Sequence, residues 1–195
     1  MAVTPSTMIA LGTKAPDFAL PDTVSGKNLS LNDLKSDKGT LIMFICNHCP
    51  FVKHVNKELV RLANDYIAKR ISFIAISSND VVNFPEDSPE KMKLEAKTLG
   101  YTFPYLYDES QSVARAYDAA CTPDFFIYDK DLKLVYRGQL DDSRPSNGIP
   151  VTGKDIRTAL NNLLAGKNIS AEQKPSIGCN IKWKTENVEY IQDVR

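Results

Sequence analysis

An apolar run that passes directly into a helical pattern constrains the fold of this chain more than any other feature. Residues 40–45 are apolar after Thr40, which is typical of a buried strand. From Pro50 onward, apolar side chains recur at the three- and four-residue steps of one helix face. These residues are Val52, Val55, Leu59, Leu62 and Tyr66. A buried strand that feeds an amphipathic helix predicts one unit of a parallel sheet.

The same alternation of strands and helices continues along the chain. Ser88 at an N-cap and Pro89 at the first helical position predict the start of a helix, and Gly100 ends it. Thr152 is the predicted N-cap of a last amphipathic helix, which Gly166 ends. The other predicted elements are strands at 71–77, 103–107, 125–128 and 132–136 and a helix at 110–117.

The order of these elements predicts an α/β fold. Parallel strands joined by helices come first, and an antiparallel hairpin and a closing helix follow. This order resembles the thioredoxin-like fold, a three-layer fold with a mixed central sheet flanked by helices. The length predicts a single domain over residues 1–195, with a core of about residues 10–167. Residues 168–195 are expected to be a C-terminal extension, a tail that contains the only tryptophan, Trp183.

Composition argues against two classes of function. The chain has 24 Lys and Arg against 24 Asp and Glu residues and a pI near 6.7. A nucleic-acid-binding protein carries excess positive charge, so no nucleic-acid partner is expected. No apolar run approaches the roughly 18 residues of a membrane helix, so no membrane partner is expected. Residues 1–8 lack the basic and apolar regions of a signal peptide, which favours a cytoplasmic, reducing setting.

Two of the four cysteines lie where the first predicted strand meets its helix. In a reducing setting, cysteines are reactive, metal-binding or simply buried rather than paired in structural disulfides. Cys46 and Cys49 form a Cys-x-x-Cys pair, and Pro50 suits the first helical position, which places Cys49 at the N-cap. The unpaired N–H groups and the dipole of a helix N-terminus lower the pKa of such a cysteine. This placement favours a thiolate nucleophile over two cysteines that only pack.

A second candidate segment, Cys121-Thr122-Pro123, directly precedes a predicted strand. Proline is tolerated at the first residue of a strand because its missing N–H costs no hydrogen bond there. In thioredoxin-like folds the proline at this place is cis and lies against the nucleophilic sulfur. The resemblance therefore implies that Thr122 and Pro123 line the substrate groove, together with His48 and Pro50.

Several segments resemble redoxin domains of the alkyl hydroperoxide reductase and thiol-specific antioxidant class. Residues 12–20 (GTKAPDFAL) are similar to the opening of these domains, residues 44–59 to their active-site strand and helix, and residues 123–129 to the strand after the cis-proline. Shorter motifs are similar to a peroxiredoxin-like branch: residues 79–80, 85–90, 137–145 and 178–183. The resemblance covers about residues 10–185 and implies thiol-based oxidoreductase activity.

The resemblance also indicates which cysteine is the nucleophile. When Phe44 and Leu59 are laid on the strand phenylalanine and the helix leucine of the thioredoxin family, Cys49 falls on the first family cysteine. Val52 then replaces the second one. Cys49 and the proline after it also resemble the Cys-Pro of peroxiredoxins, which attacks peroxides. Cys49 is therefore the expected nucleophile, with Cys46 as the alternative.

Two positions depart from the peroxiredoxin pattern. That family has Thr or Ser three residues before the attacking cysteine, where this chain has Cys46. The arginine that stabilises the thiolate in that family falls near Pro123, and the candidates to replace it are Arg115, Arg137 and Arg144. These departures weaken the expectation of peroxidase activity and leave the expectation of thiol chemistry intact.

A second thiol must resolve the intermediate that forms after the attack. Cys46 is the first choice because it is close in sequence. For Cys121, which lies two residues before Pro123, a resolving role and simple packing are equally expected. Cys179 could reach the site on the C-terminal tail as a resolving thiol, but a structural role, in which it helps Trp183 hold the tail, is the preferred expectation.

The remaining polar candidates each have an ordinary alternative. His48 either lowers the pKa of the neighbouring cysteines as a cation or faces solvent from its loop. His54 is expected on the helix surface. Residues 141–144 (DDSR) are expected to form a solvated loop, with a place at the border of the substrate groove as the alternative.

These features predict a thiol-based oxidoreductase that reduces a peroxide or a disulfide through Cys49, with Cys46 and Cys121 as further candidate catalytic residues. No cofactor is expected. The expected partners are a small peroxide or a protein disulfide, an external thiol reductant and, by analogy, a second copy of the chain. Two alternatives remain open. One is a module that binds copper or zinc through Cys46 and Cys49 with His48 between them, or zinc with Cys121 as third ligand. The other is a redox-inactive interaction domain.

Overall fold

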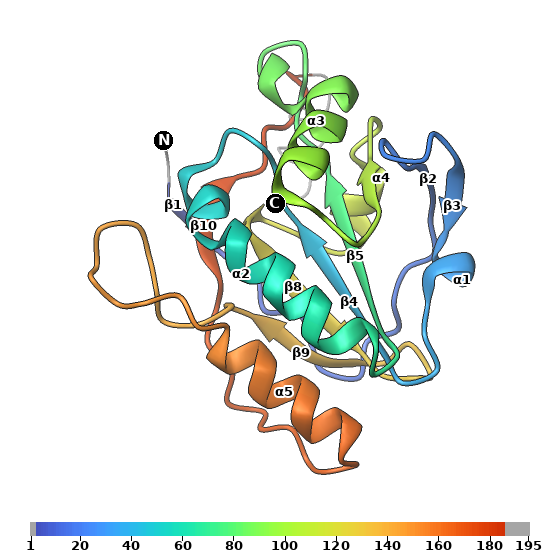
Figure 1. Ribbon diagram of the computed structural model, residues 1–195, viewed down its shortest axis with the longest axis vertical. Helices are drawn as coiled ribbons and strands as arrows, with labels where there is room; N and C mark the ends of the chain where they lie inside the picture. The colour runs from blue at the N-terminus through green and yellow to red at the C-terminus, as the bar shows by residue number, and fades with distance from the viewer. Residues whose placement is uncertain (1–2, 186–195) are drawn as a thin grey trace, which may run out of the picture.

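The computed structural model describes residues 3–185, in which a mixed sheet lies between two layers of helices (Figure 1). The central sheet has the strand order β6-β5-β4-β8-β9. Its strands are β4 (Gly39–Phe44), β5 (Ile71–Ser77), β6 (Tyr105–Tyr107), β8 (Asp124–Tyr128) and β9 (Leu134–Gly138). Strands β4, β5 and β6 are parallel, whereas β8 runs antiparallel to β4 and to β9. The predicted α/β fold, with parallel strands followed by an antiparallel hairpin, is confirmed.

Strand β4 is buried along its whole length because both faces of the sheet are covered. Leu41 and Met43 point into one apolar cluster, and Ile42 and Phe44 point into the other. A strand between two covered faces needs apolar residues at every position, not at alternate ones. This requirement explains the unbroken apolar run in the sequence.

The helices divide between the two faces of the sheet. The cluster of Leu41 and Met43 contains residues of α2 (Pro50–Ile67), α3 (Pro89–Leu99) and α5 (Lys154–Leu164). The cluster on the opposite face contains residues of α1 (Leu31–Leu34) and α4 (Ser112–Ala116). A single 3₁₀ turn, η1 (Pro85–Asp87), precedes α3. None of the helices within residues 3–185 is long and apolar enough to cross a membrane.

The predicted ends of α3 are confirmed, but the predicted start of α5 is wrong. Ser88 caps α3, and Gly100 ends it in the left-handed conformation. The N-cap of α5 is Gly153, not Thr152. The buried carboxylate of Asp141 accepts hydrogen bonds at 2.7 Å from the backbone N–H groups of Thr152 and Gly153. A side chain from another loop therefore satisfies this helix end in place of a local cap.

The tail contributes a strand that sequence patterns do not predict. Strand β10 (Ile177–Asn180) lies between β1 (Val3–Pro5) and β7 (Cys121–Thr122) and runs antiparallel to both. Figure 1 shows β10 beside β1 and close to the start of α2. A separate hairpin joins β2 (Ala19–Pro21) to β3 (Asn28–Ser30). The rest of the predicted extension, residues 186–195, lies outside the described residues.

Candidate active site

Cys49 is the N-cap of α2, as its position in the sequence predicts, and Pro50 begins the helix. The side chain of Cys49 is fully buried. Its Sγ lies 2.8 Å from the Sγ of Cys179 and 3.2 Å from the carbonyl oxygen of Thr122. The peptide bond between Thr122 and Pro123 is cis, as the resemblance implies. The start of α2, β7 and β10 therefore meet at the Cys49 sulfur.

The three thiols at this point differ in acidity. The pKa of Cys49 is lowered to about 5. Hydrogen bonds from the thiols of Cys46 and Cys179 stabilise the Cys49 thiolate, and the bond from Cys46 has the larger effect. Burial of Cys49 opposes this shift. The hydrogen bond to Cys49, together with burial, raises the pKa of Cys46 well above its usual range. Burial and the neighbouring Cys49 raise the pKa of Cys179 to about 12. At neutral pH the site therefore holds one thiolate between two thiols.

Cys46 and Thr122 are also in contact with each other. The Sγ of Cys46 and the Oγ1 of Thr122 are 3.3 Å apart, and both side chains are buried. Cys46, Cys49, Thr122 and Pro123, all predicted site residues, therefore lie together in the structure.

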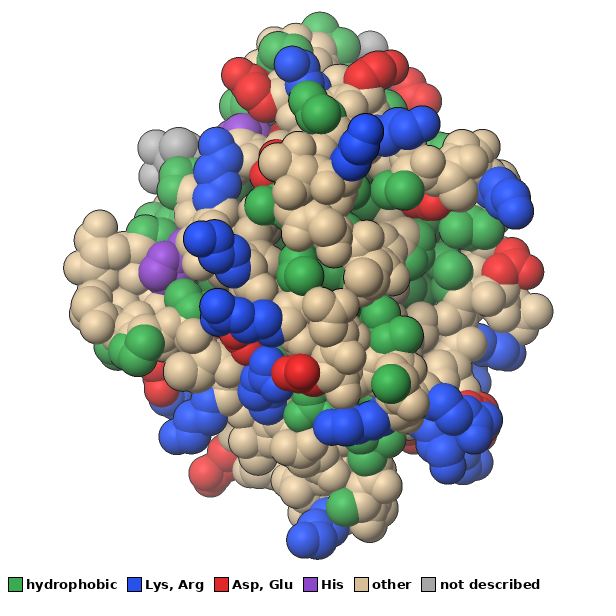
Figure 2. All heavy atoms as spheres, in the orientation of Figure 1, with side chains coloured by type: hydrophobic (Ala, Val, Ile, Leu, Met, Phe, Trp, Pro, Cys, Tyr) green, Lys and Arg blue, Asp and Glu red, His purple; other side chains and the backbone are tan. Residues whose placement is uncertain are grey.

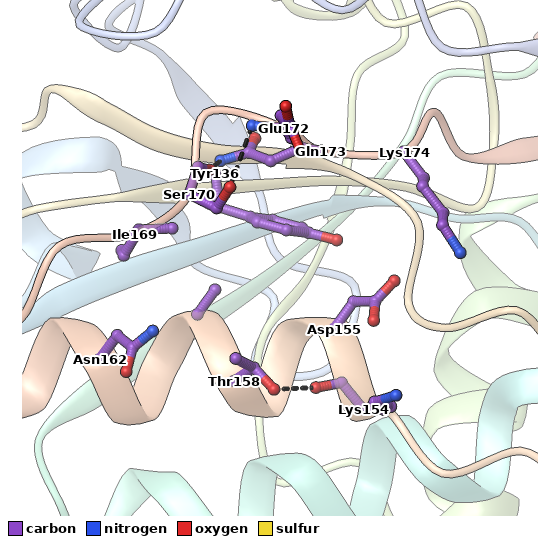
Figure 3. Close-up of a pocket in the computed structure, with 11 residues that line it drawn as sticks. Tyr136, Lys154, Asp155, Thr158, Asn162, Ile169, Ser170, Glu172, Gln173 and Lys174 are labelled. Carbon is purple, nitrogen blue, oxygen red and sulfur yellow. Dashed lines mark hydrogen bonds between the residues drawn. The ribbon is translucent and has the colours of Figure 1, made fainter.

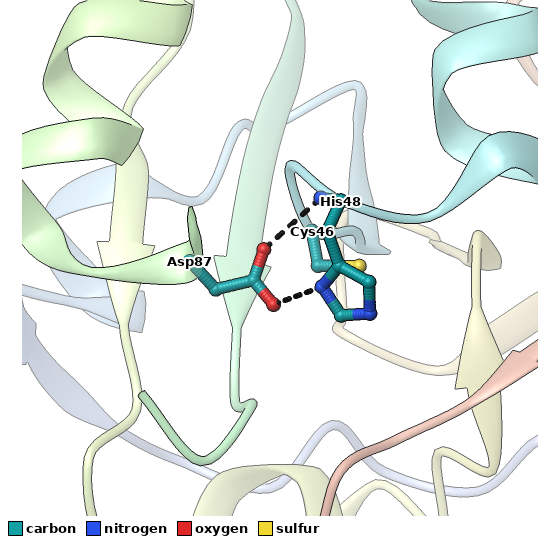
Figure 4. A group of neighbouring side chains, drawn as sticks. All are labelled: Cys46, His48 and Asp87. Atoms are coloured by element: carbon teal, nitrogen blue, oxygen red, sulfur yellow. Dashed lines mark hydrogen bonds and ion pairs between the residues drawn. The ribbon is translucent and has the colours of Figure 1, made fainter. Parts of the chain in front are cut away.

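A buried carboxylate organises the loop between β4 and α2 (Figure 4). Asp87 accepts hydrogen bonds from the backbone N–H groups of Asn47 at 2.8 Å and His48 at 3.2 Å. Its second oxygen lies 2.6 Å from Nδ1 of His48 and 2.8 Å from Nδ2 of Asn79. The His48 ring stacks on Phe84, with ring centroids 5.1 Å apart. His48 is thus mostly buried and bound to Asp87, so the solvent-facing alternative is wrong.

Cys121 occupies a different environment from the other cysteines. Its Sγ lies 3.6 Å from the carbonyl oxygen of Pro123. Burial, with a further contribution from Asp124, raises the pKa of Cys121 far above its usual range. A thiol that stays protonated is a poor nucleophile, so this environment favours packing over a resolving role.

The three arginines proposed to replace the peroxiredoxin arginine are engaged in other contacts. The guanidinium of Arg115 lies 4.5 Å above the ring of Trp183. Arg137 donates hydrogen bonds to the carbonyl of Ile9 and to the side chain of Gln173. The Arg144 guanidinium donates to the carbonyls of Asp141 and Ser143 and to the side chain of Gln139. These contacts give each guanidinium a structural role.

The expectation of a solvated loop at 141–144 is only partly right, since Asp142 is exposed but its neighbours are not. Asp141 and Ser143 are buried. Ser143 lies 2.7 Å from Nε2 of His54 and, with His54 and Pro123, lines a small cavity beside the cis-proline. The structure therefore places this loop next to the active-site helix, where His54 is half-buried rather than on the open surface.

The exposed face of α2 is basic (Figure 2). Lys53, Lys57 and Arg61 follow one another at helical spacing and are all exposed. The row begins one helical turn after Cys49. A partner that approaches Cys49 along α2 therefore meets positive charge.

Cys179 is the candidate whose place at the site sequence reasoning ranked too low. The sequence favours a structural role with Trp183 over a resolving role, yet the sulfur of Cys179 is in contact with that of Cys49, 130 positions earlier in the chain. The only signal in the sequence was its place within the motif at 178–183. That motif resembles a family branch but does not indicate where the tail runs.

Comparisons with known proteins identify the family of the chain. Residues 11–137 match the AhpC/TSA family. The thiol-disulfide oxidoreductase ResA of Geobacillus kaustophilus is 30% identical over 139 residues, which are 70% of this chain and 75% of ResA. An uncharacterized conserved protein of Geobacillus kaustophilus, solved as a crystal structure, is 65% identical with a TM-score of 0.94 over 95% of this chain and 98% of its own.

Two further crystal structures extend the comparison. A hypothetical protein of Sinorhizobium meliloti 1021 is 50% identical, with a TM-score of 0.91 over 93% of this chain and 99% of its own. Peroxidoxin BcpB of Mycobacterium tuberculosis is 22% identical, with a TM-score of 0.60 over 80% of this chain and 96% of its own, and supports the fold alone. With its thiolate at a helix N-terminus beside a cis-proline, the chain belongs to the AhpC/TSA family within the thioredoxin-like fold and is a thiol-dependent oxidoreductase.

Proposed function

We propose that the protein is a thiol–disulfide oxidoreductase whose redox-active pair is Cys49 and Cys179. The observation that carries this proposal is the 2.8 Å distance between the two sulfur atoms. A disulfide bond is about 2.05 Å long, so the two sulfurs need to approach by less than about 1 Å to form it.

The reaction begins at Cys49. Its thiolate attacks one sulfur of a substrate disulfide, forms a mixed disulfide and releases the other substrate sulfur as a thiolate. Cys179 then gives its proton to the substrate thiolate released first and attacks the Cys49 sulfur, which forms the Cys49–Cys179 disulfide and releases the second substrate thiolate. The substrate gains two electrons, and an external thiol reductant returns them to the pair.

The different acidities of the two thiols favour rapid regeneration. In thiol–disulfide exchange the thiol with the lower pKa is the better leaving group. A reductant thiolate therefore attacks the Sγ of Cys179 and expels Cys49, whose pKa is about 5. Cys46 keeps its proton in this scheme and donates a hydrogen bond to the expelled thiolate.

Two observations favour a disulfide over a peroxide as the substrate. The position that carries the peroxide-orienting Thr or Ser in peroxiredoxins holds Cys46. Arg144, the candidate arginine that lines the small cavity beside Pro123, directs its guanidinium to Asp141, Ser143 and Gln139. A peroxide lacks both of its usual partners here, whereas a disulfide needs only a thiolate and a second thiol.

Metal binding is less well supported than redox chemistry. Ligand atoms of Cys46, His48 and Asp87 do lie within 4.8 Å of one another (Figure 4). Asp87, however, already accepts four hydrogen bonds, including the contact with Nδ1 of His48. A metal ion would have to displace several of these bonds, and each lost bond in a buried network destabilises the fold.

Mass spectrometry after oxidation tests the proposed pair. The fully reduced protein is mixed with one equivalent of oxidised glutathione or of hydrogen peroxide, and unreacted thiols are then alkylated. We expect the Cys49–Cys179 disulfide in the wild type and in Cys46→Ser, and a glutathione adduct on Cys49 in Cys179→Ser. A disulfide between Cys46 and Cys49 in the wild type would overturn the pairing. Faster oxidation by hydrogen peroxide than by oxidised glutathione would replace the disulfide substrate with a peroxide.

A further inference from the structure

The edge of β7 lies directly beside the Cys49 sulfur, and β10 covers this edge. Cys179 is the register partner of Thr122, and Asn180 is the partner of Cys121. Thr122 is also the residue whose carbonyl lies 3.2 Å from Cys49 Sγ. Any extended chain that pairs with β7 in this register therefore presents one side chain to Cys49.

Gly178 allows β10 to lie unusually close to β7. A Cβ atom at this position would come within 2.0 Å of the carbonyl oxygen of Thr122 and 3.2 Å of the nitrogen of Pro123. Because both atoms belong to the backbone, neither can move aside without shifting the cis-proline loop. Only glycine therefore fits immediately before the cysteine that meets Cys49.

The C-terminal side of β10 is firmly held. The backbone N–H of Lys182 donates to Asn79 Oδ1 at 2.8 Å, and its carbonyl accepts from the N–H of Asp80 at 2.8 Å. The next residue, Trp183, lies under the guanidinium of Arg115. These contacts fix the chain just after the strand.

The N-terminal side of β10 is more exposed to solvent. Residues 170–172 and 174–175 are exposed, and the ion pair between Lys174 and Asp142 joins two exposed side chains. A cavity of about 270 Å³ lies between this segment and α5, with Tyr136 and Asp155 facing it (Figure 3). Surface ion pairs of this kind contribute little to stability. Release of β10 also has to break the hydrogen bonds of Ser176 with Ser6, of Gln173 with Arg137 and of the Lys174 carbonyl with the backbone N–H of Gln139.

We propose that the edge of β7 is a binding site for an extended, cysteine-bearing polypeptide disulfide, and that β10 occupies this site as an internal substitute for it. The inference rests on the proposed function. The uncovered edge of a strand offers backbone N–H and carbonyl groups that pair readily with another chain. The substrate takes the place of β10, and its cysteine takes the place of Cys179.

The return of β10 then completes the reaction. With the substrate on β7, the Cys49 thiolate attacks the substrate disulfide, and the substrate's other sulfur leaves as a thiolate. When β10 re-enters, deprotonated Cys179 attacks Cys49 and releases the bound cysteine as a thiolate. Since β10 and the substrate compete for one edge, formation of the Cys49–Cys179 disulfide and release of the product occur together. Because only glycine fits against the Thr122 carbonyl at position 178, substrates with glycine immediately before the reacting cysteine should be preferred.

Peptide probes test the site in the full-length, reduced protein. The probe has the sequence Ser-Ile-Gly-Cys-Asn-Ile with its cysteine joined to thionitrobenzoate, and the matched probe has valine in place of glycine. Release of coloured thionitrobenzoate measures attack by Cys49. The proteins compared are the wild type, Gly178→Val, which expels β10 by steric clash, and Lys174→Glu, which weakens only the exposed approach.

We expect the glycine probe to react at least about tenfold faster with Gly178→Val than with the wild type, and severalfold faster with Lys174→Glu. The valine probe should react more slowly than the glycine probe with all three proteins. Equal rates for the two probes in every protein would overturn the binding site. Because Lys174 is exposed, Lys174→Glu keeps the test valid if Gly178→Val does not fold.

A small reagent separates this inference from the proposed function. Iodoacetamide should alkylate Cys49 selectively in all three proteins, and fastest in Gly178→Val, because the buried thiolate at the start of α2 becomes accessible when β10 moves away. If Cys49 does not react with iodoacetamide in any of them, the proposed nucleophile is wrong. If Cys49 reacts but the glycine probe has no advantage, only the β7 site is wrong.

Discussion

Asp87 accepts a hydrogen bond from the backbone N–H of Asn47 at 2.8 Å, which ties the turn before α3 to the loop that leads into α2. The same carboxylate accepts from the next N–H in that loop, and the loop ends at the N-cap Cys49. The geometry that places a thiolate over the helix end therefore depends on a carboxylate 38 positions later in the chain.

Replacing Asp87 with alanine should destabilise the protein by about 3 kcal/mol, because buried donors of the Asn47 loop and Asn79 lose their acceptor. Urea denaturation at neutral pH measures this loss. Asp87→Asn, which keeps one acceptor oxygen, is the matched control and should cost less. Equal stability of Asp87→Ala and the wild type would contradict the role assigned to this carboxylate.

The same group makes stability depend on pH. Burial raises the pKa of Asp87, but hydrogen bonds from His48 and Asn79 outweigh burial, so the net shift is downward. A carboxyl with a lowered pKa in the folded state stabilises the protein above its unfolded pKa of about 4, and this stabilisation is lost as the pH falls further. The difference in stability between the wild type and Asp87→Asn should therefore shrink below about pH 4.

Replacing Cys46 with alanine should raise the pKa of Cys49, because the largest stabilising hydrogen bond to its thiolate is lost. The measurement is the pH dependence of Cys49 alkylation by iodoacetamide, read by mass spectrometry. In the wild type the rate should rise through a midpoint near pH 5. Cys46→Ser, which retains a donor, should shift this midpoint less than Cys46→Ala. An unchanged midpoint in Cys46→Ala would show that Cys46 does not stabilise the thiolate.

Replacing Asp124 with asparagine should stabilise the protein above neutral pH. Burial raises the pKa of Asp124 to about 7, and its Oδ2 has no hydrogen-bond partner among residues 3–185. A carboxyl with a raised pKa costs stability as the pH rises from its unfolded pKa of about 4 through its folded pKa. At pH 8, Asp124→Asn should gain on the order of 2 kcal/mol over the wild type, and at pH 4 little or nothing. Parallel stability curves for the two proteins across this range would contradict the assignment.

Replacing Gly138 with alanine should loosen the tail without touching the thiols. Gly138 has φ of +126°, and a Cβ atom there would lie 2.0 Å from the carbonyl oxygen of Lys174. Backbone strain and this clash together should cost about 2–4 kcal/mol. Limited proteolysis should then cut the segment at 167–175 faster than in the wild type. Gly148→Ala, at a left-handed glycine with open space around it, is the control for strain alone.

The nucleophile could be predicted from the sequence because its environment is local. A buried strand, a cysteine and a helix that begins with Pro50 lie within a few residues of one another. Helix-start geometry depends on such neighbours, so the position of Cys49 at the N-cap follows from the sequence alone. The cis peptide bond before Pro123 followed in turn from a family resemblance at that segment.

The partner thiol could not be predicted in this way. Strand β10 is four residues long, contains a glycine and pairs with a strand of two residues. Such a segment carries no alternation of apolar and polar residues, and its pairing is decided by contacts more than 50 positions away in sequence. Asp87 was missed for the same reason, since a buried carboxylate in an acidic, proline-rich stretch reads as a solvated turn.

The place of β10 near the end of the chain also determines when a newly synthesised protein completes its active site. The ribosome releases the central sheet and Cys49 well before residues 177–180. A nascent chain therefore passes through a stage in which its nucleophile is made and uncovered while the thiol that faces it has yet to be translated. During that stage Cys179 can neither cover nor resolve Cys49, so β10, the last strand of the described residues, is also the one that completes the site.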